Sequence, residues 1–170
     1  LPDGSFADTA DDAETLVRRP RDPSDNAYPG GAASALMALT TMSALTGRPD
    51  WRAVADSAVI GLSGLQQDHP RFAGWSLAAL AALTSGPTQI AVVAEPADPA
   101  AADLRRAAFR GARAGAVIAS GSGEPTVPLL ADRPLQRSAT AYVCREFVCA
   151  LPVTRDDELA QQLESQPSSR

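Results

Sequence analysis

The stretch GPTQIAVVAEPADP, residues 86–99, marks the change of structural period that decides the fold of this chain. A glycine and a proline end the preceding helical pattern, and the apolar, partly β-branched run QIAVVAE (89–95) predicts a strand. The next segment, DPAAADLRRAAFRGAR (98–113), predicts a helix, and AVIAS (116–120) predicts a second strand. A strand, a helix and a strand within about 30 residues form a βαβ unit, so we expect two parallel strands joined by a right-handed crossover.

Three further elements complete the second half of the chain. TVPLL (126–130) and TAYVC (140–144) predict two more strands. RDDELAQQLES predicts a last helix with Thr154 as its N-cap and acidic residues in its first turn. The final residues, 166–170, are expected to form a disordered tail. We therefore expect a small α/β domain over residues 87–165.

The first half of the chain predicts helices. Residues 29–47 carry no charge and residues 71–86 carry none after the first position, whereas residues 49–67 are amphipathic, with Trp51, Val54, Ala58, Leu62 and Leu65 on one face. A helix that is apolar on all sides must be covered on all sides, while an amphipathic helix can face water. Short connections make neighbouring helices antiparallel. An α/α toroid and a plain helical bundle both fit this pattern. Either gives an α+β protein whose residues 1–86 form a leading extended segment followed by helical hairpins.

Composition narrows the class of function. The chain has 170 residues, of which 45% are hydrophobic and 21% charged, with a net charge of −5. These totals are typical of one folded domain with room for a small appendage. An acidic protein without a basic stripe is not expected to bind nucleic acid. All 15 basic residues are Arg, so covalent chemistry on lysine is excluded.

The N-terminal residues and the apolar segments bear on location. The chain begins without Met and without a basic segment followed by an apolar one, so we expect a piece of a longer protein and no signal peptide. The longest uncharged span, residues 72–94, is broken at Gly86 and Pro87, which leaves about 14 helical residues where a membrane helix needs about 20. We expect a cytoplasmic protein with no membrane partner.

The two cysteines, Cys144 and Cys149, allow three interpretations. On one straight strand they would lie about 16 Å apart, and on a helix they would point apart. A tight hairpin with Glu146 and Phe147 at its tip would set them opposite each other at a distance that a disulfide bridges, although Glu-Phe is a poor two-residue turn. Two thiolates and one distant histidine do not make a zinc site. The residues alone favour two buried free thiols over a redox pair.

Two other polar features favour structural interpretations. His69, the only histidine, lies in a loop before a proline with no nucleophile beside it, so loop packing is favoured over a general-base role. SGSGEP (120–125) follows a predicted strand but lacks the further glycine and the helix that a phosphate-binding loop requires. We therefore expect a flexible turn there.

Charged residues gather in the leading segment, ahead of the first uncharged helix. They are Asp8, Asp11, Asp12, Glu14, Arg18, Arg19, Arg21, Asp22 and Asp25. One interpretation is a solvated loop with surface ion pairs, each worth about 0 to 1 kcal/mol. The other is a cleft at the mouth of the helical domain, lined by these groups.

Four segments together resemble the C-terminal part of the YyaL-type thioredoxin-domain-containing proteins, a group that includes vertebrate spermatogenesis-associated relatives. The segments are FADTADDAETLVRRPRDPSDNAYPGGAAS (6–34), QIAVVAEPADP (89–99), VPLLADRP (127–134) and AYVCREFVCALPVTRDDEL (141–159). The resemblance covers essentially the whole chain, and its most specific piece is the cysteine segment followed by Pro-Val-Thr.

This resemblance implies a parent with an N-terminal thioredoxin-like domain and an α/α toroid similar to N-acylglucosamine 2-epimerases and six-hairpin glycosidases. The present chain would be the last hairpins of that toroid (1–86) followed by the α/β appendage (87–165). It implies a carbohydrate-related or redox-related role for the parent, no cofactor, and no complete active site in this chain. The thioredoxin-like domain is then the expected partner, together with a sugar-like small molecule.

The family motif ahead of the first helix covers Asp11, Arg19, Pro20, Asp25 and Pro29. From this match, Asp11, Arg19 and Asp25 are the ligand-binding candidates, with Arg19 and Asp25 expected to hold a sugar-like ligand by hydrogen bonds. No catalytic residue and no metal ligand is assigned.

The chain also departs from the family. Members read Pro-Ser-Gly-Asn where this sequence has Pro29, Gly30, Gly31 and Ala32, so a hydroxyl and an amide are missing at the expected cavity mouth. Cys144 and Cys149 match the family pair, which favours a structural or redox purpose more than the residues alone do. A rival hypothesis is a non-enzymatic scaffold that docks the thioredoxin-like domain or another protein.

Overall fold

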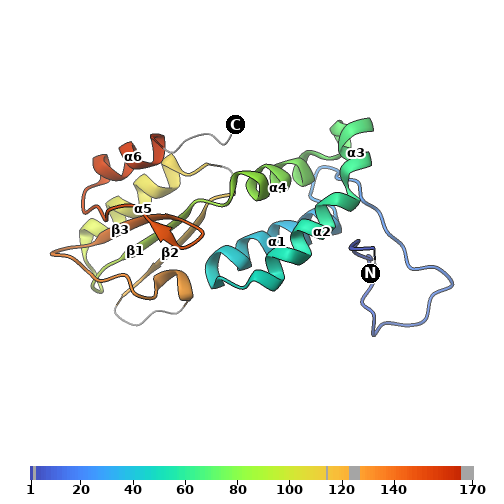
Figure 1. Cartoon of the computed structure of the whole chain (residues 1–170), viewed down its shortest axis with the longest axis horizontal. Helices are drawn as coiled ribbons and strands as arrows, with labels where there is room; N and C mark the ends of the chain where they lie inside the picture. Colours follow the sequence, from blue (N-terminus) through green and yellow to red (C-terminus); the bar gives the residue numbers. More distant parts are fainter. Residues whose placement is uncertain (2, 114, 123–126, 166–170) are drawn as a thin grey trace. The chain divides into compact units, whose positions relative to one another are not determined.

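The computed structural model describes residue 1 and residues 3–113, 115–122 and 127–165. The chain divides into two compact units (Figure 1). The first unit comprises Leu1–Ser43 and Arg48–Leu83, and the second comprises Ala44–Gly47 and the chain from Thr84 onward. Helices dominate the first unit and a sheet lies in the second, which confirms the α+β class.

Helices make up the ordered elements of the first unit. Residues 3–30 form turns and bends without a helix or strand. The elements that follow are α1 (Gly31–Thr46), α2 (Pro49–Gly61), α3 (Ser63–Asp68), the 3₁₀ helix η1 (Pro70–Phe72) and α4 (Gly74–Ser85). Side chains of α1, α2 and α4 form one apolar core, whose buried members are Leu36, Ala55, Ala58, Leu62, Ala79 and Leu83.

The predicted helix over residues 49–67 is wrong in its continuity and partly wrong in its buried face. It breaks at Leu62, whose N–H bonds to the carbonyl of Val59 three residues earlier, 3.1 Å away, next to the helix-weakening Gly61. Ala55 is buried in the core, while Val54 remains 45% exposed. The inward face therefore keeps Ala58 and Leu62 of the predicted set, with Ala55 buried in place of Val54.

The two uncharged helices are less covered than expected. Met37 and Met42 of α1 are 36% and 40% exposed, and Trp75 of α4 is 41% exposed. Helix α4 also begins later than the predicted residue 71, because η1 precedes it. The prediction that both helices are covered on all sides is thus wrong for the residues that the structure describes.

A four-stranded sheet in the order β2-β1-β3-β4 organises the second unit. Its strands are β1 (Gln89–Val93), β2 (Val117–Gly121), β3 (Thr140–Arg145) and β4 (Val148–Cys149). β1 and β2 are parallel and are joined through helix α5 (Pro99–Gly111), which confirms the βαβ unit. β3 runs antiparallel to β1, and β4 pairs antiparallel with β3 at the end of the order.

Both faces of the central strands β1 and β3 are buried. Helices α5 and α6 (Asp156–Glu164) lie side by side over one face (Figure 1), and they pack their leucines against Ile90, Val92 and Val143. The other face packs against the end of α1 and the 3₁₀ helix η2 (Pro128–Leu130), with the cysteine hairpin in the same cluster. Burial on both sides explains why β1 reads as a continuous apolar run.

Two local predictions in this unit are wrong. TVPLL (126–130) is not a strand, because Pro128 fixes φ, lacks an N–H for a strand ladder and opens η2 instead. Arg155 rather than Thr154 is the N-cap residue of α6, and its side chain pairs with Asp157. Thr126, the last three residues of SGSGEP and the predicted tail (166–170) lie outside the described residues.

Candidate functional site

The β3–β4 hairpin has Glu146 and Phe147 at its tip, although this pair has a poor composition for a two-residue turn. Arg145 pairs with Val148, so Glu146 and Phe147 form a two-residue loop. Their φ angles are 48° and 64°, and a two-residue type I′ turn requires positive φ at both positions. The backbone N–H of Phe147 donates to Gln89 Oε1 at 2.8 Å, so a buried side chain of β1 holds the turn in place.

The hairpin register joins the two cysteines. Cys144 lies opposite Cys149, with their Cα atoms 3.9 Å apart and their sulfurs bonded as a disulfide. The expectation of two free thiols is therefore wrong. It rested on the poor turn composition of Glu-Phe, and it did not foresee the support that Gln89 gives to the turn from another strand.

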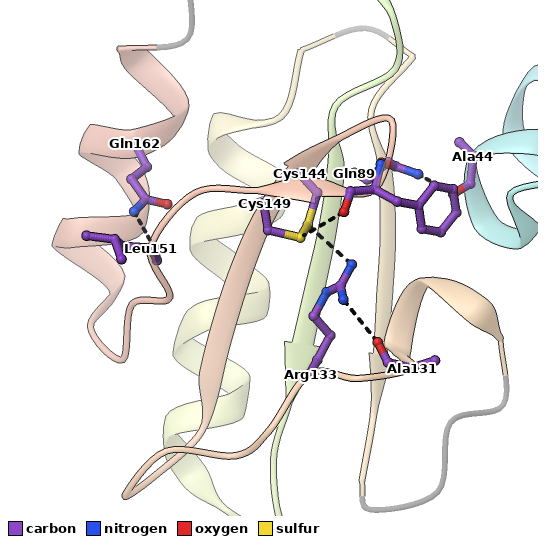
Figure 2. The surroundings of a disulfide bond; sticks show 9 residues. Ala44, Gln89, Ala131, Arg133, Cys144, Cys149, Leu151 and Gln162 are labelled. Atoms are coloured by element: carbon purple, nitrogen blue, oxygen red, sulfur yellow. Dashed lines mark hydrogen bonds between the residues drawn. A yellow bond between two sulfur atoms is a disulfide. The ribbon is translucent and has the colours of Figure 1, made fainter.

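The two cysteine residues differ in exposure. Cys144 belongs to β3 and is 1% exposed within the apolar cluster, while Cys149 is half-buried on β4, the last strand of the sheet. After Cys149, the carbonyl of Leu151 accepts a hydrogen bond of 2.8 Å from Gln162 Nε2 of α6 (Figure 2). The disulfide thus has one buried end and one end near the margin of the sheet.

A guanidinium lies beside the buried end (Figure 2). Arg133 Nη2 is 3.9 Å from Cys144 Sγ, and Nη1 donates to the carbonyl of Ala131 at 3.0 Å. The guanidinium carbon is 5.8 Å from the centre of the Tyr142 ring. Arg133 Nε is buried and has no hydrogen-bond partner among the described residues. A cation is therefore held next to one sulfur of the pair.

Gln89 links the same hairpin to the end of α1. Its Nε2 donates to the carbonyl of Ala44 at 2.6 Å, while its Oε1 accepts from Phe147. The ring of Phe147 would lie 3.3 Å from a Cβ at Gly47, whose φ of 72° suits glycine. Sequence reasoning missed both Gln89 and Arg133, although a polar residue at the start of an apolar strand was a visible signal.

Asp25, a ligand-binding candidate, is 5% exposed, and its carboxylate accepts three hydrogen bonds from backbone N–H groups. Its Oδ2 accepts hydrogen bonds from the N–H groups of Trp75 at 2.9 Å and Ser76 at 3.1 Å, and its Oδ1 accepts from Gly30 at 2.9 Å. Because Trp75 and Ser76 are in the first turn of α4, Asp25 serves as a cap supplied from elsewhere in the sequence. All three donors belong to the backbone of the first unit.

The other two ligand-binding candidates lie in different surroundings. Arg19 is half-buried, and its Nη2 and Nε donate to the carbonyl and the hydroxyl of Thr9. Asp11 is exposed. Arg19 lines a cavity of about 410 Å³ whose other lining residues are Leu1, Asp3, Arg18 and Arg21. The structure does not bring Asp11 and Asp25 into the lining of that cavity.

A second cavity of about 410 Å³ in the first unit is lined by residues that include Asp3, Arg18 and Arg21. Hydrogen bonds from the hydroxyl and backbone N–H of Ser5 lower the pKa of Asp3 to about 2, with a smaller contribution from Arg21. Arg21 donates to both Asp3 and Ser5, so the charged groups satisfy one another.

The backbone around Gly30 leaves no room for a side chain. A Cβ at Gly30 would lie 2.6 Å from the carbonyl oxygen of Ser24, which is closer than real contacts allow. The backbone around Asp25 therefore requires glycine at this position.

The remaining candidates form no site. His69 is an exposed residue after α3, which agrees with a loop role. Among the described residues, no group of three or more His, Cys, Asp or Glu is placed to hold a metal ion. The helices in the described ranges are all too short or too polar to cross a membrane. Comparison with protein-family models, curated proteins and solved structures gave no match.

Proposed function

We propose that this chain is the C-terminal part of a longer protein similar to the YyaL-type thioredoxin-domain-containing proteins, and that Cys144 and Cys149 exchange a disulfide with a dithiol. The observation that carries the proposal is the cross-strand disulfide with one end at the sheet margin and a guanidinium beside the other. In this interpretation the first unit supplies the last hairpins of an α/α toroid. The reacting partner is the thioredoxin-like domain of the parent chain.

The surroundings of the cysteines favour exchange over a purely structural bond. Cys149 is half-buried on the outermost strand, so a partner thiol has a direction of approach. A positive charge near sulfur favours the thiolate, which is the form that reacts in exchange. In the cytoplasm, where we place this protein, disulfides of ordinary proteins are transient and serve redox chemistry.

The alternative carbohydrate-related role has weaker support in this chain. Asp25, expected to hold a sugar, already accepts three backbone hydrogen bonds. Arg19 is bonded to Thr9. A sugar hydroxyl would also have little access to the Asp25 carboxylate, which is 5% exposed, and we therefore prefer the redox-related role.

Redox titration of the folded protein tests the exchange function. The oxidised chain is equilibrated in glutathione and dithiothreitol buffers of graded potential, its thiols are alkylated, and mass spectrometry counts the labels on Cys144 and Cys149. We expect both thiols to appear in one two-electron step between about −200 and −300 mV, the range of cellular dithiol exchangers. Circular dichroism should show that the fold persists. Reduction that occurs only at lower potential, or only on unfolding, would identify a structural bond and contradict the proposal.

The intact mass of the native gene product, measured from its own cells, tests the relation to a parent protein. A mass far above 17.6 kDa supports the proposal that a thioredoxin-like domain precedes this chain. A mass near 17.6 kDa would mean that the gene product has no room for a thioredoxin-like domain, so the proposed partner would not belong to the same chain.

A second candidate function is a non-enzymatic scaffold that docks the thioredoxin-like domain or another protein. Several large apolar side chains of the first unit are exposed and would be covered by a docked partner, among them Tyr28 at 72%, Ile60 at 71% and Trp75 at 41%. This function predicts binding of the preceding segment of the gene product in calorimetric titration, with equal affinity for the oxidised and the reduced chain. An affinity that depends on the redox state would instead favour exchange.

A further inference from the structure

The two sulfurs of the proposed exchange site face groups of opposite polarity. Cys144 Sγ has Arg133 Nη2 3.9 Å away (Figure 2). Cys149 Sγ lies 3.7 Å from the carbonyl oxygen of Phe147. A guanidinium stabilises negative charge on sulfur, and a carbonyl oxygen opposes it. When the bond breaks, the electron pair is therefore better accommodated on Cys144 than on Cys149.

The donor geometry of Arg133 strengthens this asymmetry. Nε and Nη2 lie along one edge of the planar guanidinium, and such an edge can donate two parallel hydrogen bonds to one anionic acceptor. Nη2 faces Cys144 Sγ, while Nε is buried without a partner among the described residues. A thiolate on Cys144 would offer an acceptor to this unused donor.

Accessibility selects the same direction of reaction. Thiol–disulfide exchange requires the attacking thiolate, the attacked sulfur and the leaving sulfur to lie in line, so the attacked sulfur must be reachable. Cys144 is 1% exposed, whereas Cys149 is half-buried on the last strand of the sheet. The more exposed cysteine of the pair is thus not the one that Arg133 contacts.

We propose that an incoming thiolate attacks Cys149 Sγ, and that Arg133 stabilises Cys144 as the leaving thiolate. This inference rests on the proposed exchange function and adds the order of the steps. The first step forms a bond between the partner sulfur and Cys149 Sγ and breaks the Cys144–Cys149 bond, leaving the electron pair on Cys144. The second thiol of the partner, as thiolate, then attacks the partner sulfur of the mixed disulfide and releases Cys149, which takes up a proton. The partner dithiol is oxidised by two electrons and the protein disulfide is reduced by two.

Mapping of the mixed disulfide tests the site of attack in the unaltered protein. The oxidised chain is treated briefly with glutathione, the reaction is stopped with acid, and peptide mass spectrometry locates the adduct. The proposal expects glutathione on Cys149 in large excess over Cys144. An adduct mainly on Cys144, or equal amounts on both, would overturn it.

Three variants test the role of Arg133. We expect Arg133→Met to slow reduction by dithiothreitol about three- to tenfold, because the leaving thiolate loses its cation. Arg133→Lys should recover much of the rate, since it keeps the charge. Arg110→Met, which removes an exposed arginine of α5, should react at the rate of the unaltered protein. Equal rates for Arg133→Met and the unaltered protein would contradict the proposal.

A pH profile separates this role from a structural one. In a Cys149→Ala background Cys144 is the only thiol, so the ultraviolet absorbance of thiolate reports Cys144 alone. The absorbance should develop at lower pH with Arg133 present than with Arg133→Met, and Arg133→Lys should shift it back. An unchanged profile would overturn the inference. If the unaltered protein is reduced readily while these tests fail, the exchange function stands and only the assignment of steps falls; if no folded form is reduced, the exchange function itself fails.

Discussion

One buried carboxylate, Asp25, fixes the beginning of α4. A helix begins with four N–H groups that lack partners inside the helix, and a capping side chain usually comes from the residue just before it. Here the residue before α4 is Ala73, which has no polar side chain, and Asp25 reaches the N–H groups of Trp75 and Ser76 instead. The backbone N–H of Asp25 also donates to the carbonyl of Phe72 at 2.7 Å, so the leading segment and the helix start are tied together.

We expect Asp25→Ala to lower the free energy of unfolding by about 2 to 4 kcal/mol, because it removes a charged cap and leaves buried donors without acceptors. Urea denaturation followed by circular dichroism measures the change. Asp11→Ala is the matched control, since it removes an exposed carboxylate from the same segment and should cost less than about 0.5 kcal/mol. Unchanged stability of Asp25→Ala with weakened binding of a sugar would restore the ligand-binding role.

The sequence drew attention to Asp25 but suggested a different role for it. Its position before an uncharged helix was visible, whereas its acceptance of N–H groups 50 residues later depends on the tertiary fold. Arg133 was harder to single out, because a lone arginine in VPLLADRP carries no pattern of its own. Contacts across long sequence separations decide the chemistry of both residues, and residue spacing does not encode those contacts.

At the scale of elements, the hairpin depends on a strand that is not part of it. Glu146 and Phe147 both have positive φ, a conformation that costs most residues more energy than it costs glycine or asparagine. Gln89 compensates through its hydrogen bond to Phe147, and its other hydrogen bond holds the Ala44 carbonyl near the end of α1. The disulfide adds a covalent link across the same strand pair.

We expect Gln89→Leu to destabilise the oxidised protein by about 2 to 4 kcal/mol, because it leaves the buried Ala44 carbonyl and the partly buried Phe147 N–H without partners, and a buried group without a partner costs about 1 to 3 kcal/mol. Thermal or urea unfolding of the oxidised protein measures this loss. Gln67→Leu, at an exposed position of α3, controls for the change of residue type and should be nearly neutral. A neutral Gln89→Leu would mean that water or another group replaces both hydrogen bonds.

Elements with strong local patterns were predictable, and elements set by other parts of the chain were not. The apolar run of β1 and the amphipathic α5, with Asp98 accepting from the Ala100 N–H as its cap, carry their structure in their own residues. The hairpin was disfavoured on turn composition alone. The prediction of a strand over residues 126–130 was wrong, because it gave more weight to the apolar residues than to Pro128. Apolar character predicted burial there correctly, since Leu129 and Leu130 are buried, but it did not predict extended backbone.

At the scale of the whole molecule, several exposed carboxylates accept hydrogen bonds from serine or arginine residues close to them. The carboxyls whose pKa is lowered are Asp3, Asp22, Asp50 and Asp157. Serine donors are the main cause for Asp3 and Asp22, and neighbouring arginines are the main cause for Asp50 and Asp157. The contacts with Asp50 and Asp157 in turn raise the pKa of Arg48 and Arg155.

These shifts predict that acid destabilises the protein. A carboxyl whose folded pKa is lowered stabilises the fold above its unfolded pKa, and this contribution disappears as the pH falls through the folded pKa. For Asp3, the contribution should be complete above about pH 4 and lost by about pH 2. The free energy of unfolding, measured with urea at a series of pH values, should therefore decline over this interval.

The variant Asp3→Asn assigns part of that decline to one group. It removes the titrating charge, so it should be less stable than the unaltered protein at pH 7, and the difference should shrink as the pH approaches the folded pKa of about 2. Asp11→Asn, at another exposed position of the leading segment, controls for the loss of one negative charge from a protein of net charge −5. For each variant, the compared quantity is its difference in unfolding free energy from the unaltered protein. If this difference shrinks equally for both variants as the pH falls, the general relief of charge repulsion is responsible. If it shrinks only for Asp3→Asn, the hydrogen bonds from Ser5 and Arg21 set the acid stability of this segment.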